Sequence, residues 1–150
     1  MLIAQNKKAL FNYEILDRLE AGISLTGSEV KSIRAGRISL KESHAEIRDG
    51  EVFLVNCHIS PYEEASIFNH DPLRDRKLLF HRQEIKRWGG KVVEKGLTIV
   101  PVKVLINNKG KIKIEMALAR GKRVHQKREA IRERDRNREM QRELKHLKRG

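Results

Sequence analysis

The chain has few of the residues that build disulfide frameworks, cysteine metal sites and base-stacking platforms. It has 150 residues but one cysteine, Cys57, which excludes an internal disulfide and a cysteine-based zinc site. Its four Phe, two Tyr and one Trp are too few for a platform that stacks long single strands. Apolar runs reach only a few residues, which excludes a transmembrane helix, and residues 1–10 lack the apolar core of a secretory signal. We therefore expect a protein of the reducing cytoplasm with no membrane partner.

Recognisable catalytic motifs are also missing. The sequence contains no phosphate-binding GxxxxGK[ST] loop, no GxSxG and no HExxH. Its six histidines are scattered, with no pair at ligand spacing on one helix. We predict a non-enzyme without metal or cofactor, in which Cys57 is a small core residue.

One catalytic alternative is a magnesium-dependent nuclease site at Asp71 and Asp75, with Glu63 and Glu64 nearby. We favour a turn at Asp71 instead, because a proline follows it. The neighbouring cations expected to compensate these carboxylates are Arg74, Arg76 and Lys77.

Positive charge is abundant and unevenly placed. The chain carries 33 Lys+Arg against 20 Asp+Glu, a net charge of +13, which favours a nucleic acid as partner. Residues 120–150 hold thirteen of the basic and five of the acidic residues, with few core-forming side chains. We therefore divide the chain into a body, residues 1–121, and a basic tail, residues 122–150, that cannot bury enough apolar surface to fold alone.

Alternation of apolar and polar residues predicts a mainly β body. Strands are expected at 11–15, 22–25, 97–106 and 111–119, and residues 16–20 either extend the first strand or form a short turn. Asp49-Gly50 between residues 44–48 and 51–55 indicates a hairpin, and residues 61–77 are expected to form a loop. Helices are expected at 28–35, capped by Ser28 and ended by Gly36, and at 81–94.

This pattern gives about six short strands with two or three short flanking helices. An antiparallel barrel of the oligonucleotide-binding type is the favoured fold, because closure removes the exposed edges of a small sheet. A sandwich fits short strands nearly as well.

The tail has the composition of an RNA-binding segment. Nine of the thirteen cations in residues 120–150 are Arg, which suits bidentate phosphate contacts, and no Gly or Pro interrupts residues 122–149. At helical spacing, Arg128, Arg132 and Arg136 line one face, and a second stripe runs through Arg134, Arg138 and Arg142. We expect this segment to be disordered when free and to fold as a helix on a polyanionic surface, with structured RNA the favoured partner.

Ordered motifs along the whole chain resemble the small protein B family, the SsrA-binding proteins of bacterial trans-translation. They are residues 6–9 (NKKA), 20–23 (EAGI), 27–32 (GSEVKS), 69–79 (NHDPLRDRKLL), 96–101 (GLTIVP) and 117–123 (ALARGKR). The resemblance implies a monomeric adaptor that binds the transfer-RNA-like domain of transfer-messenger RNA near its elbow and delivers it to stalled ribosomes. The tail is then expected to enter the empty messenger channel, near the ribosomal RNA of the decoding centre.

The resemblance also assigns roles to residues. RNA contacts fall at Asn6, Lys7, Glu20, Leu79, Lys122 and Arg123, and ribosome contacts at His125, Lys127, Arg128, Arg132, Arg134, Arg136, Arg138 and Arg142. Gln126 stands where the family often has an acidic residue. Glu20 is an anion on a surface for a polyanion, so we expect it to accept hydrogen bonds from a base. Pairing with a lysine or capping a turn at Gly22 is the alternative.

Three functions stay open on the residues alone. They are an RNA-binding adaptor, a ribosome-associated structural protein and an RNA-processing enzyme. The ordered motifs favour the adaptor over the structural protein, and metal-dependent turnover would identify the enzyme.

Overall fold

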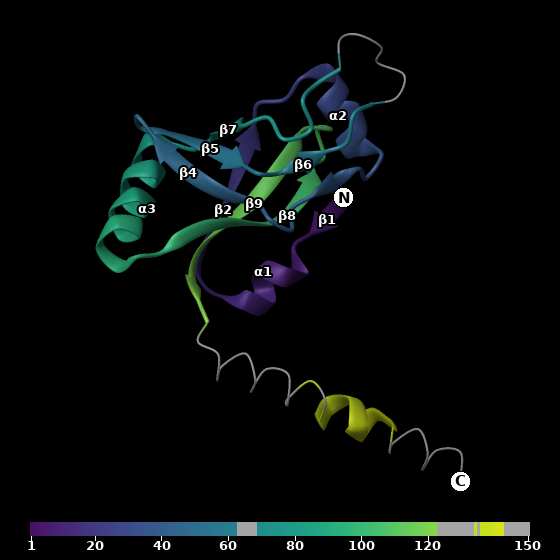
Figure 1. The fold of residues 1–150 in the computed structure, drawn as a ribbon, viewed down its shortest axis with the longest axis vertical. Helices are drawn as coiled ribbons and strands as arrows, with labels where there is room; N and C mark the ends of the chain where they lie inside the picture. Colours follow the sequence, from purple (N-terminus) through teal and green to yellow (C-terminus); the bar gives the residue numbers. More distant parts are fainter. Residues whose placement is uncertain (63–68, 123–133, 135, 143–150) are drawn as a thin grey trace.

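Six antiparallel strands close into a ring in the computed structural model, which describes residues 1–62, 69–122, 134 and 136–142 (Figure 1). In spatial order the ring contains β8 (Thr98–Ile106), β4 (His44–Arg48), β5 (Glu51–Val55), β7 (Arg76–Leu79), β2 (Tyr13–Ile23) and β9 (Ile112–Gly121). Pairing of β9 with β8 closes the ring. The predicted barrel of about six strands is therefore confirmed, and the sandwich is not found.

Two short additions extend the barrel. Strand β1 (Leu2–Gln5) pairs with the end of β8, and β3 (Ile38–Ser39) pairs with β6 (His58–Ile59) as a separate two-stranded sheet. The hairpin of β4 and β5 has the predicted bounds, with Asp49 and Gly50 both at positive φ, as a tight two-residue turn requires.

Strand β9 is buried on both faces. Ile114, Met116 and Leu118 point into the barrel, where they join the main core with Leu54 and Ile99. The alternate residues Ala117 and Ala119 lie on the outer face and pack with Ala9 of α1 (Lys7–Asn12). Small side chains on the outer face of β9 thus let a short helix lie directly against the barrel.

The other two helices begin and end largely as the sequence indicates. Helix α2 (Gly27–Arg34) is capped by Thr26 rather than the expected Ser28, because the Thr26 side chain accepts from the Glu29 amide. Gly36 follows it at φ 77°. Helix α3 (Arg82–Lys95) follows β7 and ends at Gly96 in the left-handed conformation. Its Trp88 is buried, and the indole Nε1 donates to Asp17 Oδ2 of β2 at 2.9 Å.

Three predicted elements are wrong in detail. Phe11 and Asn12 belong to α1, so the first long strand begins at Tyr13. That strand continues without a turn to Ile23, which merges the strands expected at 11–15 and 22–25. The region expected to be a loop at 61–77 contains the start of β7, whose partners, β5 and β2, are distant in sequence.

A buried ion-pair network fixes α2 to the barrel. Arg76 and Glu29 are both fully buried, and Arg76 Nε donates to Glu29 Oε2 at 2.6 Å. Arg74 Nη2 binds the other oxygen of Glu29, also at 2.6 Å. The expectation that Arg74, Arg76 and Lys77 compensate Asp71 and Asp75 is therefore wrong. The two arginines form ion pairs with Glu29, and Lys77 pairs with Glu51.

No helix among the described residues has the length and apolar character needed to cross a membrane.

Candidate nucleic-acid interface

The RNA-binding residues predicted from the sequence separate into two groups at opposite ends of β2. Lys7 and Lys122 lie at the end where β2 begins, because the Lys122 amide donates to the carbonyl of Asn12 at 2.9 Å. Glu20 and Leu79 lie at the other end, where Gly22 of β2 pairs with Leu79 of β7. Glu20 lies seven positions after Tyr13 along β2, which corresponds to about 23 Å. The body therefore offers two surfaces rather than one cluster.

The first surface, which we name the Leu79 hollow, is an open depression of about 340 Å³. It is lined by Gly22, Ile23, Leu25, Val30, Leu79, Gly110, Lys111, Ile112 and Lys113. Leu79 is 56% exposed, and a Cβ on Gly22 would lie 3.2 Å from Leu79 Cδ1. The glycine thus gives the leucine room to lie over β2. An exposed leucine in a hollow that two lysines also line suits a ligand with an apolar face and negative charge, as a nucleotide has.

Lys111 and Lys113 of the Leu79 hollow were missed by the sequence analysis. Lys113 is cross-strand from Gly22 in the β2–β9 pairing, and Lys111 follows the turn at 107–110. The sequence signal is the outward position of Lys113 in the alternation of β9, but only the register of β2 places it near Leu79.

Glu20 is exposed on the outer face of β2, directly cross-strand from Glu115. Glu115 is held by Arg18 at 3.0 Å and Lys103 at 3.1 Å. Burial opposes ionisation of Glu115, but these two cations outweigh it and lower its pKa. Within the described part of the chain, no cation pairs with Glu20, and β2 runs straight through Gly22, so there is no turn for Glu20 to cap. Its carboxylate is open to a donor from outside the protein.

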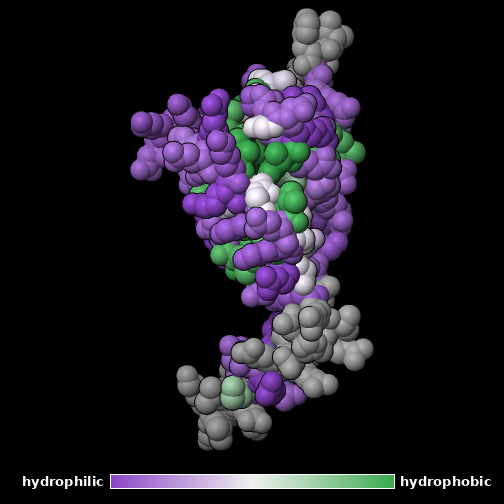
Figure 2. Space-filling view, turned by 90° about the vertical axis from the view of Figure 1, so that its left-hand side faces the viewer, coloured by the Kyte–Doolittle hydropathy of each residue, from purple (hydrophilic) through white to green (hydrophobic). Residues whose placement is uncertain are grey.

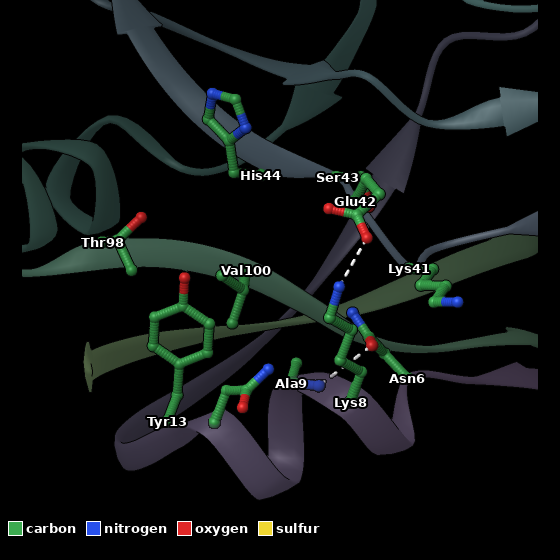
Figure 3. Close-up of a pocket in the computed structure, with 11 residues that line it drawn as sticks. Asn6, Lys8, Ala9, Tyr13, Lys41, Glu42, Ser43, His44, Thr98 and Val100 are labelled. Carbon is green, nitrogen blue, oxygen red and sulfur yellow. Dashed lines mark hydrogen bonds and ion pairs between the residues drawn. The ribbon is translucent and has the colours of Figure 1, made fainter. Parts of the chain in front are cut away.

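The second surface surrounds α1 and contains a hollow of about 320 Å³ (Figure 3). Its lining residues are Asn6, Lys8, Ala9, Asn12, Tyr13, Lys41, Glu42, Ser43, His44, Thr98 and Val100. Lys8 Nζ binds Glu42 Oε1 at 2.5 Å across its mouth, while Lys41 points away from that pair in Figure 3. Lys7 is exposed beside this hollow.

Asn6 is buried, and its side chain is hydrogen-bonded to other groups of the protein. Its Nδ2 donates to the carbonyls of Leu40 at 3.1 Å and Pro101 at 2.9 Å, and its Oδ1 accepts from the Ala9 amide at 3.1 Å. These bonds cap α1 and fix it to β8. The structure therefore makes Asn6 a residue that positions α1 and its lysines.

The remaining predicted residues belong to the end of the chain. Arg123, His125, Lys127, Arg128 and Arg132 lie outside the described residues. Arg134, Arg136, Arg138 and Arg142 are helical and exposed. The guanidinium of Arg134 lies over the ring of Phe11 in α1, 5.3 Å from its centroid, which places this arginine against the second surface.

The nuclease alternative finds no support in the geometry. Asp71 Oδ1 accepts from the Leu73 amide at 2.9 Å, as expected for a turn, and Asp75 pairs with Arg48 at 2.8 Å. Glu63 and Glu64 lie outside the described residues. Among the residues that are described, no three His, Cys, Asp or Glu side chains are grouped to hold a metal. Cys57 is fully buried, as expected of a core residue.

Comparison with known proteins agrees with this picture. The family model described as SmpB protein matches residues 3–146. The chain is 56% identical over 143 residues to an SsrA-binding protein of Symbiobacterium thermophilum, covering 95% of this chain and 90% of the relative. An SsrA-binding protein of Acetivibrio thermocellus is 55% identical over 144 residues, covering 96% and 93%.

A solved structure described as "tmRNA-SmpB: a journey to the center of the bacterial ribosome" is similar in fold. It has a TM-score of 0.68 and 48% sequence identity, covering 86% of this chain and 94% of the other. Identity at this level over nearly the whole length, on the same barrel, shows that the chain belongs to the SmpB family.

Proposed function

We propose that this chain is an RNA-binding adaptor of trans-translation, with no catalysis of its own. It binds the transfer-RNA-like domain of transfer-messenger RNA near the elbow and brings it to stalled ribosomes, so that the nascent chain is tagged for proteolysis. The observation that carries the proposal is kinship over 95% of the chain with proteins named SsrA-binding protein. The solved relative supports the ribosome as second partner.

The Leu79 hollow is the proposed contact for transfer-messenger RNA. Leu79 supplies an exposed apolar contact, and Lys111 and Lys113 supply charges for phosphates. Glu20 accepts hydrogen bonds from an exocyclic amine of a base, which requires the open carboxylate described above. Specificity therefore rests on Glu20 and affinity on the lysines.

The α1 surface and the tail complete the proposed interface. Lys7 and Lys122 bind phosphates beside α1, which Asn6 holds in place, and Arg123 continues this contact by sequence. His125, Lys127, Arg128, Arg132, Arg134, Arg136, Arg138 and Arg142 are proposed to bind ribosomal RNA as the tail enters the empty messenger channel.

The decisive experiment compares binding of the full chain to transfer-messenger RNA and to an equal amount of transfer RNA. We expect a clear preference for transfer-messenger RNA, and equal binding would contradict the adaptor. With four to six phosphates neutralised, log K against log salt should slope by roughly −3 to −5. Incubation of the RNA with the protein and Mg²⁺ should leave it intact, and metal-dependent cleavage would support an enzyme instead.

Two variants test the Leu79 hollow. Lys113→Ala should lower the salt slope by about one, because each phosphate contact contributes about that amount. Arg48→Ala, at the end of β4, removes the same charge outside both proposed RNA surfaces and is the control. Glu20→Gln should reduce the preference for transfer-messenger RNA while leaving nonspecific RNA binding nearly unchanged. If the salt slope is the same in Lys113→Ala and in the control, and Glu20→Gln keeps the full preference for transfer-messenger RNA, the contact lies elsewhere.

A further inference from the structure

Helix α3 contains two adjacent glycines, and crowding requires glycine at neither position. Glycine is less favourable than any ordinary residue but proline inside a helix. Gly89 faces the barrel, where a Cβ would lie 3.4 Å from Ile47 Cδ1 of β4. Gly90 is exposed, and a Cβ there would meet nothing within 4 Å. Its φ is not positive, so neither crowding nor backbone conformation requires glycine at this position.

The surface around Gly90 is exposed and carries two cations, one carboxylate and one apolar side chain. Helical spacing places Lys86 and Arg87 one turn before it, and Val93 and Glu94 one turn after it. All four are exposed, Val93 to 85%. The helix as a whole has five cations and two carboxylates, and one of these, Glu84, accepts from the His81 amide as a cap. This composition favours an anionic ligand.

Figure 2 looks onto the flank of the barrel where α3 lies and shows a narrow apolar and neutral strip bordered by hydrophilic residues. An apolar groove of about 470 Å³ runs here between α3 and β4, with Gly89, Val92 and Val93 on its helix side. Gly90 is not among its lining residues. The groove therefore borders the surface around Gly90 through Val93, which belongs to both.

The place of α3 in the fold connects it with the proposed site for transfer-messenger RNA. Leu79 stands three residues before the first residue of α3. On the other side, Arg87 Nη2 and Trp88 Nε1 both bind Asp17 Oδ2 of β2, three residues before Glu20. The helix thus follows Leu79 closely along the chain and is fastened to β2 at Asp17.

We propose that the exposed face of α3 centred on Gly90 is a further contact for the sugar–phosphate backbone of transfer-messenger RNA. Lys86 and Arg87 pair with phosphates, and Gly90 lets the RNA backbone approach the helix more closely than any side chain would allow. Arg87 is half exposed and keeps other N–H groups beside the one that binds Asp17. This inference rests on the proposed function, because it names the same RNA as ligand.

The test uses a substitution whose effects on stability and binding should have opposite signs. In the full chain, Gly90→Ala should raise the melting temperature by about 2 to 4 °C, since the alanine fits an exposed helix without strain. The same substitution should weaken binding to transfer-messenger RNA about tenfold or more, because its methyl group blocks the approach. Gly89→Ala adds the same methyl on the barrel side of the helix and should leave RNA affinity unchanged.

A second variant does not depend on the shape of the helix. Lys86→Ala should lower the salt slope of transfer-messenger RNA binding by about one. A more stable Gly90→Ala with unchanged RNA affinity would overturn the inference, as would an unchanged slope in Lys86→Ala. Loss of ribosome binding or of a protein partner, with transfer-messenger RNA binding intact, would overturn it too. Failure of the wild-type chain to prefer transfer-messenger RNA would instead refute the proposed function, so the two failures are distinguishable.

Discussion

Arg76 Nε donates to Glu29 Oε2 at 2.6 Å, and neither side chain reaches solvent. Arg76 makes further bonds to the carbonyls of Cys57, Asp71 and Pro72, so one guanidinium joins β7, α2 and the segment between them. Both residues come from motifs that the sequence analysis assigned to the family resemblance, 27–32 and 69–79. These motifs therefore include residues of the scaffold as well as residues of the interface.

Breaking this pair should be costly. Arg76→Ala leaves the Glu29 carboxylate buried beside a cavity, and we expect a loss of about 3–5 kcal/mol in the free energy of unfolding. Chemical denaturation would measure it. Lys77→Ala, which breaks only the exposed pair with Glu51, should change stability by less than about 1 kcal/mol. Equal effects of the two substitutions would contradict the structural role of Arg76.

The same carboxylate should make stability depend on acid pH. Burial opposes ionisation of Glu29, but bonds from Arg74, the Thr26 amide and Arg76 outweigh it and lower the pKa from 4.5 to about 2. A group with a lowered folded-state pKa stabilises the fold above its unfolded pKa and loses that contribution as pH falls. We therefore expect Glu29 to contribute to a decline in stability between about pH 4.5 and 2. In Glu29→Gln, that part of the decline should be missing.

Attachment of α3 to β2 should depend on Asp17. The indole of Trp88, the Arg18 amide and the charges of Arg87 and Lys91 lower the pKa of this carboxyl despite partial burial. Asp17→Asn removes the charge and should destabilise the body by about 1–2 kcal/mol, since hydrogen bonds to charged groups are stronger than neutral ones. Fluorescence of Trp88, the one tryptophan, should report a looser α3. An unchanged emission spectrum and melting temperature would show that α3 is held by apolar contacts alone.

Cys57 should be inert in the folded protein. Its Sγ is buried and donates to the Ser39 carbonyl at 3.5 Å, and burial raises the pKa of the thiol to about 12. Because the thiolate is the reactive form, alkylation at neutral pH should be slow and should follow unfolding. Fast labelling without loss of structure would contradict the burial of this residue.

The tail should matter for tagging rather than for RNA capture. Deleting residues 124–150 should leave transfer-messenger RNA binding nearly intact but abolish tagging of stalled chains. Glu139 lies within the described helical residues, and Glu139→Pro should reproduce much of that loss, since proline costs about 3 kcal/mol inside a helix. Glu139→Ala is the control and should tag normally. Normal tagging by the proline variant would mean that the tail works as an extended strand.

The elements predicted well are those specified by local chemistry. Asp49-Gly50 defines the hairpin because both residues must adopt positive φ, and α3 is predicted by its own apolar spacing. The strands β1 and β7 were missed because each is only four residues long and is stabilised by pairing with strands far along the chain. Helix α1 was missed because its stability comes from Asn6 and Ala9 packing on β8 and β9 rather than from its own sequence.

The residues of the candidate interface also divide into those that the sequence predicts and those that only the fold brings together. Glu20, Leu79 and Lys122 were named from motifs, and the structure shows where they lie but separates them along β2. Lys111 and Lys113 join Leu79 only through strand register, which no local pattern encodes. Asn6 shows the reverse case, because a motif residue expected on the RNA surface is buried and holds α1.

The pairing of β9 on both edges has a mechanical consequence. The tail continues from the end of β9, which is hydrogen-bonded to β2 from Tyr13 to Gly22 and to β8 from Thr98 to Ile106. These bonds lie nearly perpendicular to the strands, so tension applied along the tail loads many of them together in shear instead of opening them one at a time. The barrel is thus built as an anchor for its own C-terminal segment, and force on the tail is distributed over two ladders before it reaches the core.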